Sequence, residues 1–319
     1  MRILYRLAKA GGGLLLAVIL LVGCVHLWNG RGAGAQALGA AGPQDIRLAS
    51  FNVHYILLDK PDGAWSVADW ERRRPAMIQS VTNLGADIIA FQEMESFRRG
   101  DEGSTNLARD ALLDAMPSYA AAATGDPAVF PTTQPIFYRK ERLTLLDQGW
   151  FFFSKTPDVI YSRTFNGSFP AFASWAEFHD LHSGQDLRVV NVHFDYSSGD
   201  NRLQTANLVR DRVADWTQKG EHVVLVGDLN AMAGSKTVDI LKNAGLDLMP
   251  VKGSTYHLNH GLNLFGAIDH VMYDCGTLMQ ERPVAIRQRF DGVWPSDHYP
   301  ILAQLTPGAG SCTPQGQDS

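Results

Sequence analysis

Between residues 44 and 306 the chain alternates short apolar runs with stretches of helical periodicity. The runs are rich in Val, Ile and Phe and are bounded by Gly, Pro or Asp, which predicts β-strands. With no second linker and no internal repeat, the alternation predicts one layered α/β or α+β domain. We expect strands at 46–53, 87–92, 135–139, 171–178, 187–194, 222–227, 267–273 and 299–305. We expect helices at 66–84, 105–116, 201–218 and 235–244, with Pro75 kinking or splitting the first.

Polar residues follow several of these apolar runs where each run ends. Asn52 ends the first run, Glu93 follows the second, and Asp228 follows the sixth. A single Asp at a strand end is more often a turn or helix cap, but layered α/β domains also build their sites at strand ends. Carboxylates with Asn oxygens suit a hard cation such as Mg²⁺ or Mn²⁺. The other members of the set are His193, Asp195, Asn230, Asp269, His270, Asp297 and His298.

Two of the histidines extend this chemistry. His193 and His298 can transfer protons near neutral pH or hydrogen-bond a phosphate oxygen. Asp269 could orient His298, as a carboxylate does in a catalytic dyad. Three cysteines in the whole chain exclude a disulfide-dense scaffold and a zinc site made of four thiolates.

The N-terminal segment, residues 1–28, indicates an export signal or a membrane anchor. Three basic residues among the first nine precede an apolar stretch at 11–28. A buried core helix fits poorly with this position at the extreme terminus. Three outcomes stay open: an uncut helix, cleavage near residues 33–35, or lipidation of Cys24. In each case we expect the rest of the chain outside the cytoplasm, on the periplasmic or cell-surface side.

The composition of the remaining chain suggests where the folded part begins and ends. Residues 29–43 are rich in Gly and Ala and predict a flexible linker, and residues 307–319 predict a disordered tail. The domain is therefore expected at 44–306. Cys275 and Cys312 would meet oxidising conditions outside the cytoplasm, where they either pair or stay as free thiols.

The charge balance argues against a chain that coats nucleic acid. The formal charge is −5, and the 24 cations and 33 acids after residue 35 leave −9. The basic run 72–74 is interpreted as a solvated helix face, whereas Arg98 and Arg99 are candidates for holding a phosphate-bearing substrate. The aromatic run 150–153 favours a buried strand over a stacking surface, and residues 257–260 favour a plain loop over substrate contact.

Six short motifs lie in order along the chain. They are Phe51-Asn52-Val53, Phe91-Gln92-Glu93, Asn191-Val192-His193-Phe194-Asp195, Val226-Gly227-Asp228-Leu229-Asn230, Ile268-Asp269-His270 and Ser296-Asp297-His298-Tyr299-Pro300. Together they resemble the motifs of the endonuclease/exonuclease/phosphatase superfamily. The resemblance spans about residues 46–305 and looks closest to the deadenylase-like and sphingomyelinase-like branches. It implies a four-layer α/β sandwich, with two packed mixed β-sheets flanked by helices, and metal-dependent hydrolysis of a phosphate ester.

The same resemblance assigns metal-binding positions to three residues. Asn52 and Glu93 match the metal positions, and Asp297 matches a metal-linked acid. The implied ion is Mg²⁺ or Mn²⁺, which would neutralise phosphate charge.

Five further residues match the positions that carry out the reaction. Asp228 matches the residue that activates or orients the attacking water, and Asn230 its partner that holds the phosphate. His193 matches a phosphate-contacting or acid histidine. Asp269 matches the acid that orients the closing histidine, His298.

These observations predict an exported, membrane-tethered phosphodiesterase or phosphatase. Val192 stands where many members carry Thr, and His270 where an aromatic is common, but neither departure removes a reactive group. The substrate could be a nucleic acid, a phospholipid or an inositol phosphate, and no protein partner is implied. The alternatives are an extracytoplasmic nuclease on DNA or RNA and a non-catalytic binding module on the same fold.

Overall fold

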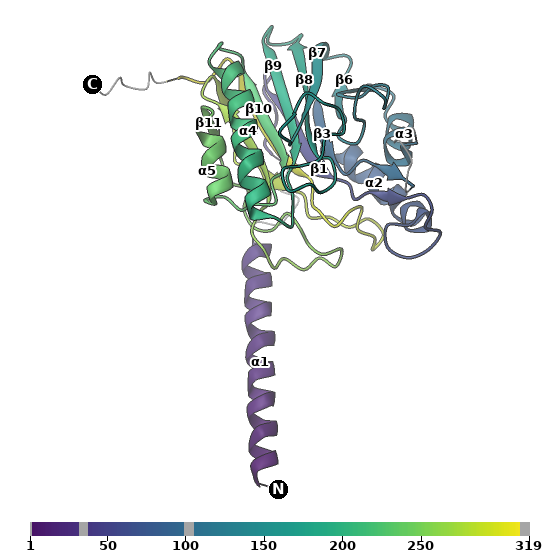
Figure 1. Ribbon diagram of the computed structural model, residues 1–319, viewed down its shortest axis with the longest axis vertical. Helices are drawn as coiled ribbons and strands as arrows, with labels where there is room; N and C mark the ends of the chain where they lie inside the picture. The colour runs from purple at the N-terminus through teal and green to yellow at the C-terminus, as the bar shows by residue number, and fades with distance from the viewer. Residues whose placement is uncertain (1, 32–37, 99–104, 313–319) are drawn as a thin grey trace, which may run out of the picture.

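The computed structural model describes residues 2–31, 38–98 and 105–312 (Figure 1). Arg99 therefore lies outside the described residues. A long helix, α1 (Arg2–Gly30), leaves one side of a domain built from two β-sheets and their covering helices. One helix, Gly12–Gly30, is long and apolar enough to cross a membrane among the described residues.

The first sheet has seven strands in the order β13-β15-β1-β3-β6-β5, with β14 paired to β15. The second has six strands in the order β11-β12-β10-β9-β8-β7. The first sheet contains β1 (Ile46–Asn52), β3 (Ile88–Gln92), β5 (Tyr119–Ala122), β6 (Ile136–Arg139), β13 (Thr277–Met279), β14 (Val284–Ala285) and β15 (Ile301–Pro307). The second contains β7 (Leu143–Phe152), β8 (Phe172–Asp180), β9 (Asp186–His193), β10 (Val223–Asp228), β11 (Leu246–Leu248) and β12 (Asp269–Asp274). A short parallel pair stands apart, β2 (Ile56–Leu57) and β4 (Ser96–Phe97).

Three apolar clusters hold these elements in four layers. The central cluster fills the space between the two sheets, with residues such as Leu48 and Val226 fully buried. The outer clusters lie between each sheet and its helices. The predicted four-layer α/β sandwich, with mixed sheets flanked by helices, is confirmed. The first sheet is covered by α2 (Val67–Leu84) and α3 (Leu107–Ala115), and the second by α4 (Gly199–Thr217) and α5 (Lys236–Lys242).

The directions of the strands place the predicted site residues together. In the β1–α2–β3 and β9–α4–β10 units the flanking strands are parallel, so their carboxyl ends meet at one edge. We call this the site edge. The chain connections at this edge are 53–66, 93–98, 123–135, 153–171, 194–198, 229–235, 249–268 and 286–300.

Helix α2 differs from its prediction at its proline and at one arginine. Ser66 caps its start by accepting a hydrogen bond from the Asp69 amide, and Gly85, with φ 55°, ends it. Pro75 lies inside and neither splits nor ends the helix, because buried residues along its whole length pack on the first sheet. Arg73 is 2% exposed, so the expected solvated face is wrong for this residue. Its guanidinium donates to three backbone carbonyls, those of Val53, His54 and Pro295.

Several strands were not predicted from the sequence. β5 is mostly alanine, and β7 is interrupted by Asp147, Gln148 and Gly149, so neither forms a continuous run of strand-forming apolar residues. Within 150–153, the side chains of Phe151 to Phe153 are buried, as expected for a strand. Other shifts are of one or two residues at element ends, which is the usual uncertainty of such boundaries.

The two ends of the domain are more ordered than the composition indicates. Cys275 and Cys312 form a disulfide, which selects one of the two open alternatives and fixes the start of the expected tail. β15 continues to Pro307, so residues 307–312 are part of the fold. Leu38, inside the expected linker, is buried against the outer cluster of the first sheet.

Candidate active site

Strand register brings three of the candidate residues side by side. In the second sheet, Asp228 at the end of β10 pairs with His193 of β9 on one side and with Asp269 of β12 on the other. Gly227 makes this pairing possible: its φ is 138°, and a Cβ there would lie 1.9 Å from the Val192 carbonyl oxygen. Only glycine fits this close approach of β10 to β9.

The first sheet contributes Asn52 and Glu93. The Asn52 amide Nδ2 donates to Glu93 Oε1 at 3.0 Å and to Asp228 Oδ2 at 3.3 Å, so it links the two sheets. Glu93 has φ 53°, a left-handed conformation that is uncommon for a residue with a side chain. His54 and Asn230, which also follow site strands, are left-handed too, with φ 64° and 45°. Such strained positions concentrate at functional sites.

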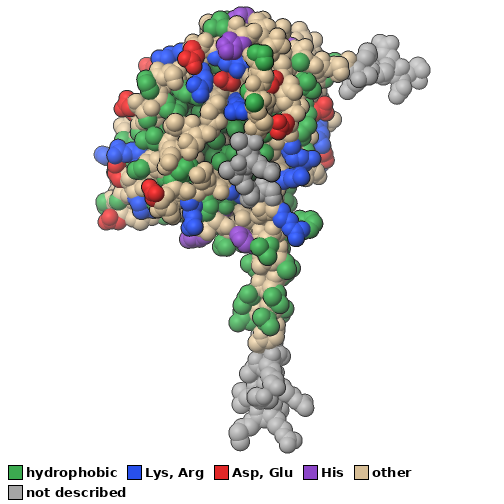
Figure 2. All heavy atoms as spheres, turned by 180° about the vertical axis from the view of Figure 1, so that it is seen from behind, with side chains coloured by type: hydrophobic (Ala, Val, Ile, Leu, Met, Phe, Trp, Pro, Cys, Tyr) green, Lys and Arg blue, Asp and Glu red, His purple; other side chains and the backbone are tan. Residues whose placement is uncertain are grey.

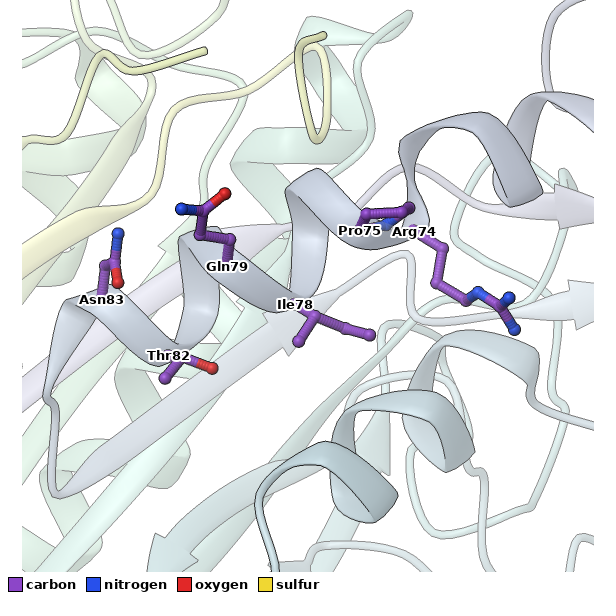
Figure 3. A pocket seen from close by; sticks show the side chains of 6 residues that line it. All are labelled: Arg74, Pro75, Ile78, Gln79, Thr82 and Asn83. Carbon is purple, nitrogen blue, oxygen red and sulfur yellow. The ribbon is translucent and has the colours of Figure 1, made fainter. Parts of the chain in front are cut away.

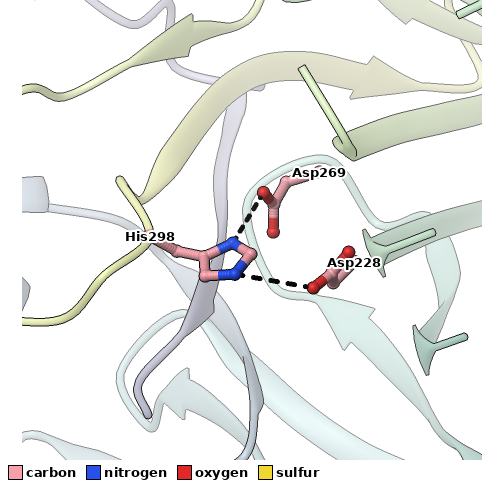
Figure 4. Close-up of side chains that lie close together, drawn as sticks. All are labelled: Asp228, Asp269 and His298. Carbon is pink, nitrogen blue, oxygen red and sulfur yellow. Dashed lines mark hydrogen bonds and ion pairs between the residues drawn. The ribbon is translucent and has the colours of Figure 1, made fainter. Parts of the chain in front are cut away.

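His298, Asp269 and Asp228 form the buried centre of the site (Figure 4). Asp269 Oδ2 and His298 Nδ1 are 3.0 Å apart, and His298 Nε2 lies 3.7 Å from Asp228 Oδ2. All three side chains are buried. Burial alone would lower the pKa of His298, but the carboxylates of Asp269, Asp228 and Asp297 outweigh it and raise this pKa well above its usual range. At neutral pH the imidazole is therefore a cation that can donate from Nε2.

Asp228 is the most perturbed acid of the group. Burial, followed by the nearby Asp269 carboxylate, raises the pKa of Asp228 to about 6. The His193 imidazole lies on its other side, with Nε2 3.7 Å from Asp228 Oδ2 and 3.8 Å from Glu93 Oε1. A carboxylate with a pKa nearer neutrality is a better general base than an ordinary Asp.

Asp297 and Asn230 complete the set of candidates. Burial acts to raise the pKa of Asp297, but the charges of His298, His54 and His257 outweigh it and lower this pKa. Asn230 Nδ2 donates to the Phe194 carbonyl at 2.9 Å, and its backbone amide donates to Asp228 Oδ1 at 2.8 Å. The structure thus gathers all eight candidates at the site edge.

Two residues at this edge were not singled out from the sequence, and a third was assigned there to a solvated helix face. His54 is buried, and neither ring nitrogen has a hydrogen-bond partner among the described residues. The ring of Tyr256 lies 5.0 Å from the His298 ring. Arg73 holds the backbone on both sides of the site. His54 stands two residues after Asn52, and this closeness was the only signal for it in the sequence.

Other residues highlighted in the sequence lie away from the reacting groups. Asp195 accepts from the Ser197 and Ser198 amides in the turn before α4, and Ser198 itself caps that helix. His270 is buried and contacts the Ala231 carbonyl, and His257 is buried between Trp294 and Tyr299, in agreement with a structural role. Arg98 is exposed on the site edge.

The donor atoms of the site suit a hard divalent cation. Four carboxylates, of Glu93, Asp228, Asp269 and Asp297, meet here, and no Lys or Arg among the described residues pairs with any of them. Carboxylate and amide oxygens are the ligands that Mg²⁺ and Mn²⁺ prefer. Ligand atoms of Asp228, Asp269 and His298 also lie within 4.8 Å of one another. In that group, Asp269 and His298 already contact each other at 3.0 Å, whereas the carboxylates of Glu93 and Asp297 have no such contact with His298.

A hollow elsewhere on the surface lacks comparable chemistry. It lies along the outer face of α2 and has a volume of about 520 Å³ (Figure 3). Its lining has a single charged side chain, Arg74, and no carboxylate or imidazole. The site edge is therefore the candidate active site.

Comparison with known proteins agrees with this geometry. Residues 49–298 match the profile of the Endonuclease/Exonuclease/phosphatase family, whose members hydrolyse phosphate esters. An uncharacterized protein, L388, of Acanthamoeba polyphaga mimivirus is 26% identical over 186 residues, which is 57% of this chain and 66% of the viral protein.

Solved structures share the fold across most of the chain. A family protein of Bacteroides thetaiotaomicron is 21% identical with a TM-score of 0.68, covering 82% of this chain and 97% of its own. A mannosyl-6-phosphatase from the same species has 22% identity and a TM-score of 0.68, covering 82% and 99%. The human Nocturnin catalytic domain has 14% identity and a TM-score of 0.54, covering 84% and 96%. The profile match covers most of the chain, and the chain belongs to the endonuclease/exonuclease/phosphatase family.

Proposed function

We propose that this protein is a divalent-metal-dependent hydrolase of phosphate esters, a phosphatase or phosphodiesterase, tethered to a membrane by α1. The observation that carries the proposal is the convergence of Glu93 and Asn52 from one sheet with Asp228, Asp269 and His298 from the other. A non-catalytic binding module would have no chemical need for a buried acid beside a charged imidazole.

Asn52, Glu93 and Asp297 would hold Mg²⁺ or Mn²⁺. When bound, the ion supplies positive charge that offsets the charge of the phosphate oxygens. The hydrogen bond from Asn52 to Glu93, at 3.0 Å, orients the carboxylate, and the linked Asp228 is kept beside it. This arrangement would place the ester between the metal ligands and the reacting side chains.

The remaining residues carry the proton and charge steps. Asp228 accepts a proton from a water aligned for attack on phosphorus, and Asn52 holds its carboxylate in place. His298, kept charged and oriented by Asp269, donates a hydrogen bond to a phosphate oxygen as negative charge grows there. His193, 27% exposed at the open side, serves the leaving oxygen or a second phosphate oxygen. Asn230 presents its amide beside them.

The location outside the cytoplasm has separate support. The disulfide between Cys275 and Cys312 requires oxidising surroundings, which the cytoplasm does not offer. The apolar span Gly12–Gly30 follows a basic leader, so the domain would be on the far side of the membrane.

A chromogenic assay tests the chemistry. The full chain in detergent would be given p-nitrophenyl phosphate and bis(p-nitrophenyl) phosphate with Mg²⁺ or Mn²⁺. A panel of DNA, RNA, sphingomyelin and phosphorylated inositols then separates the substrate classes. The likeness to a mannosyl-6-phosphatase supports a monoester, and nuclease activity would show a steep loss with salt.

Paired variants separate catalysis from stability. Asp228→Asn should lower kcat by about 10²–10⁴ with little change in melting temperature. Adding His298→Ala should lower it little further, because both act on one transition state. The control is Asp274→Asn, which removes a buried acid at the opposite end of β12, where it accepts hydrogen bonds from Val223 and Thr277. It should lower the melting temperature and keep turnover. Full turnover by Asp228→Asn, or full activity in EDTA, would refute the mechanism.

A further inference from the structure

Helix α1 has the length of a bilayer crossing and ends at the domain itself. Its apolar span, Gly12–Gly30, has 19 residues, or about 28 Å at 1.5 Å per residue, against a hydrocarbon core of about 30 Å. Trp28 is exposed near its end, with the Arg31 guanidinium 5.0 Å from the ring. A Trp beside a cation is typical of the membrane–water interface. Residue 30 would therefore lie at the membrane surface.

The carboxyl end of α1 is docked on the site edge without a spacer. The Ser254 amide donates to the Asn29 carbonyl at 3.1 Å, and the Asn263 amide contacts His26 Nδ1 at 3.0 Å. Arg287 donates to the Gly30 carbonyl at 3.3 Å. Gly253 lets the chains approach, because a Cβ there would be 2.1 Å from the Asn29 carbonyl oxygen. Figure 1 shows α1 pointing away from the domain.

The docked segment leads directly into the active site. Tyr256 follows Ser254 by two residues, and the Tyr256 ring lies 5.0 Å from the His298 ring. On the other side, Asn263 leads to Gly266, where a Cβ would lie 3.2 Å from the Met232 sulfur. Met232 is two residues after Asn230. The contacts of α1 and the reacting groups therefore both lie at the site edge.

Exposed apolar side chains gather at the same edge. Twelve large apolar side chains are exposed in the described part of the domain, and nine of them belong to site-edge connections. Leu262 and Phe265, 39% and 49% exposed, flank the contact with His26. Figure 2 shows the apolar side chains of α1 continuing up to the base of the domain. The nine are Trp65, Val129, Val159, Tyr161, Phe169, Tyr196, Met232, Leu262 and Phe265.

We infer that the site edge is turned towards the bilayer that α1 enters, and that the substrate is a phosphate ester on a membrane lipid. Asn263 contacts α1 at His26, four residues below Gly30, so its loop would lie about 6 Å deeper than the helix end. That depth brings the loop to the boundary between headgroups and acyl chains, where apolar side chains insert and a lipid phosphate lies close by. Exposed Arg31 and Lys252 stand around the helix end and suit anionic headgroups. The substrate class rests on the proposed function, whereas the orientation does not.

Matched lipid and soluble esters test the substrate class. The full chain would be reconstituted in phosphatidylcholine vesicles that carry phosphatidic acid or phosphatidylglycerol. Their deacylated headgroups, glycerol 3-phosphate and glycerophosphoglycerol, are the soluble counterparts. A double variant, Leu262→Gln with Phe265→Gln, should lose about tenfold or more of lipid hydrolysis and keep turnover of p-nitrophenyl phosphate. The control, Leu181→Gln with Leu278→Gln, removes equally exposed apolar groups at the opposite edge and should change neither rate.

A depth measurement tests the orientation without activity. A fluorophore on Phe265→Cys, in a Cys24→Ser background, should be quenched by nitroxide-labelled lipid, and one on Leu278→Cys should not. Equal quenching at both positions would overturn the orientation. Hydrolysis of the chromogenic and soluble esters but not of either lipid would overturn the lipid substrate and leave the proposed function standing. Loss of all activity, including on chromogenic esters, would refute the proposed function and with it the substrate class.

Discussion

Replacing Arg73 by methionine should destabilise the domain and loosen its metal site together. The guanidinium donates hydrogen bonds of 2.8 Å to Val53, 2.5 Å to His54 and 3.0 Å to Pro295, all to backbone carbonyls. Burial lowers the pKa of Arg73 to about 10, which keeps it charged at neutral pH. Each bond from a charged donor contributes about 1.5–3 kcal/mol. Methionine also removes the cost of burying a charge, which offsets part of the lost hydrogen bonding. We therefore expect the free energy of unfolding to fall by about 3–5 kcal/mol.

The position of the three carbonyls links this loss to function. Val53 follows Asn52 directly, and Pro295 stands two residues before Asp297. One side chain therefore fixes the backbone that carries two of the three proposed metal ligands. We expect the concentration of Mg²⁺ needed for half-maximal activity to rise by about tenfold or more, as for lost supporting groups at metal sites.

Urea unfolding and metal titration measure the two effects on the same preparations. Arg74→Met is the matched control, because Arg74 is exposed and, in the described part of the chain, its one ion pair is with Glu71 across one turn of α2. Exposed pairs of this kind contribute about 0.2–1 kcal/mol, so this variant should stay near the parent in both assays. Arg73→Lys keeps the positive charge but lacks the forked guanidinium. Its stability and its Mg²⁺ requirement should therefore lie between those of Arg73→Met and Arg74→Met. If Arg73→Met lowered the free energy of unfolding no more than Arg74→Met does, the reasoning would be refuted.

Three further predictions concern other parts of the molecule. Glu93→Gln should need far more Mg²⁺ for activity, and Mg²⁺ should restore activity after EDTA only in the parent. Replacing Cys275 and Cys312 by serine should lower stability by about 2–4 kcal/mol in thermal unfolding, since the disulfide closes a loop of sequence separation 37. Asp180 is buried, which acts to raise its pKa, but hydrogen bonds from Arg142 and Ser183 lower it below 3.8. Asp180→Asn should therefore destabilise at neutral pH, and in urea titrations the difference should shrink as pH falls below about 4; a constant difference would contradict this.

Much of the fold can be predicted from apolar runs and from the polar residues that follow them. Strands such as β3 and β10 are almost continuous apolar runs, and the polar residues at their ends mark one edge because parallel strands share it. β5 could not be found in this way, since its alanines carry no β-strand preference. What the sequence cannot display is contact between distant segments. Arg73 looks like part of a basic surface run, and only the packing of α2 against the segments around Val53 and Pro295 reveals its role.

The candidate site was visible from the sequence for a related reason. Its residues lie at strand ends and fall into an ordered set of motifs, so their meeting could be predicted from the resemblance to the family. His54 and Tyr256 lack that signal, since a His in a loop and a Tyr in a loop are common. The docking of α1 could not be predicted either, because it depends on single backbone contacts such as that between Ser254 and Asn29.

The division of the site between the two sheets has a consequence for folding. Asn52 of the first sheet touches Asp228 of the second, and behind them Gln92 Nε2 donates to Asn191 Oδ1 at 2.7 Å across the same gap. Neither half holds a complete set of reacting groups. An intermediate with one sheet formed, or with both formed but not yet packed together, would be inactive. The appearance of turnover during refolding should thus report the moment at which the sandwich closes, and it should lag behind the recovery of secondary structure.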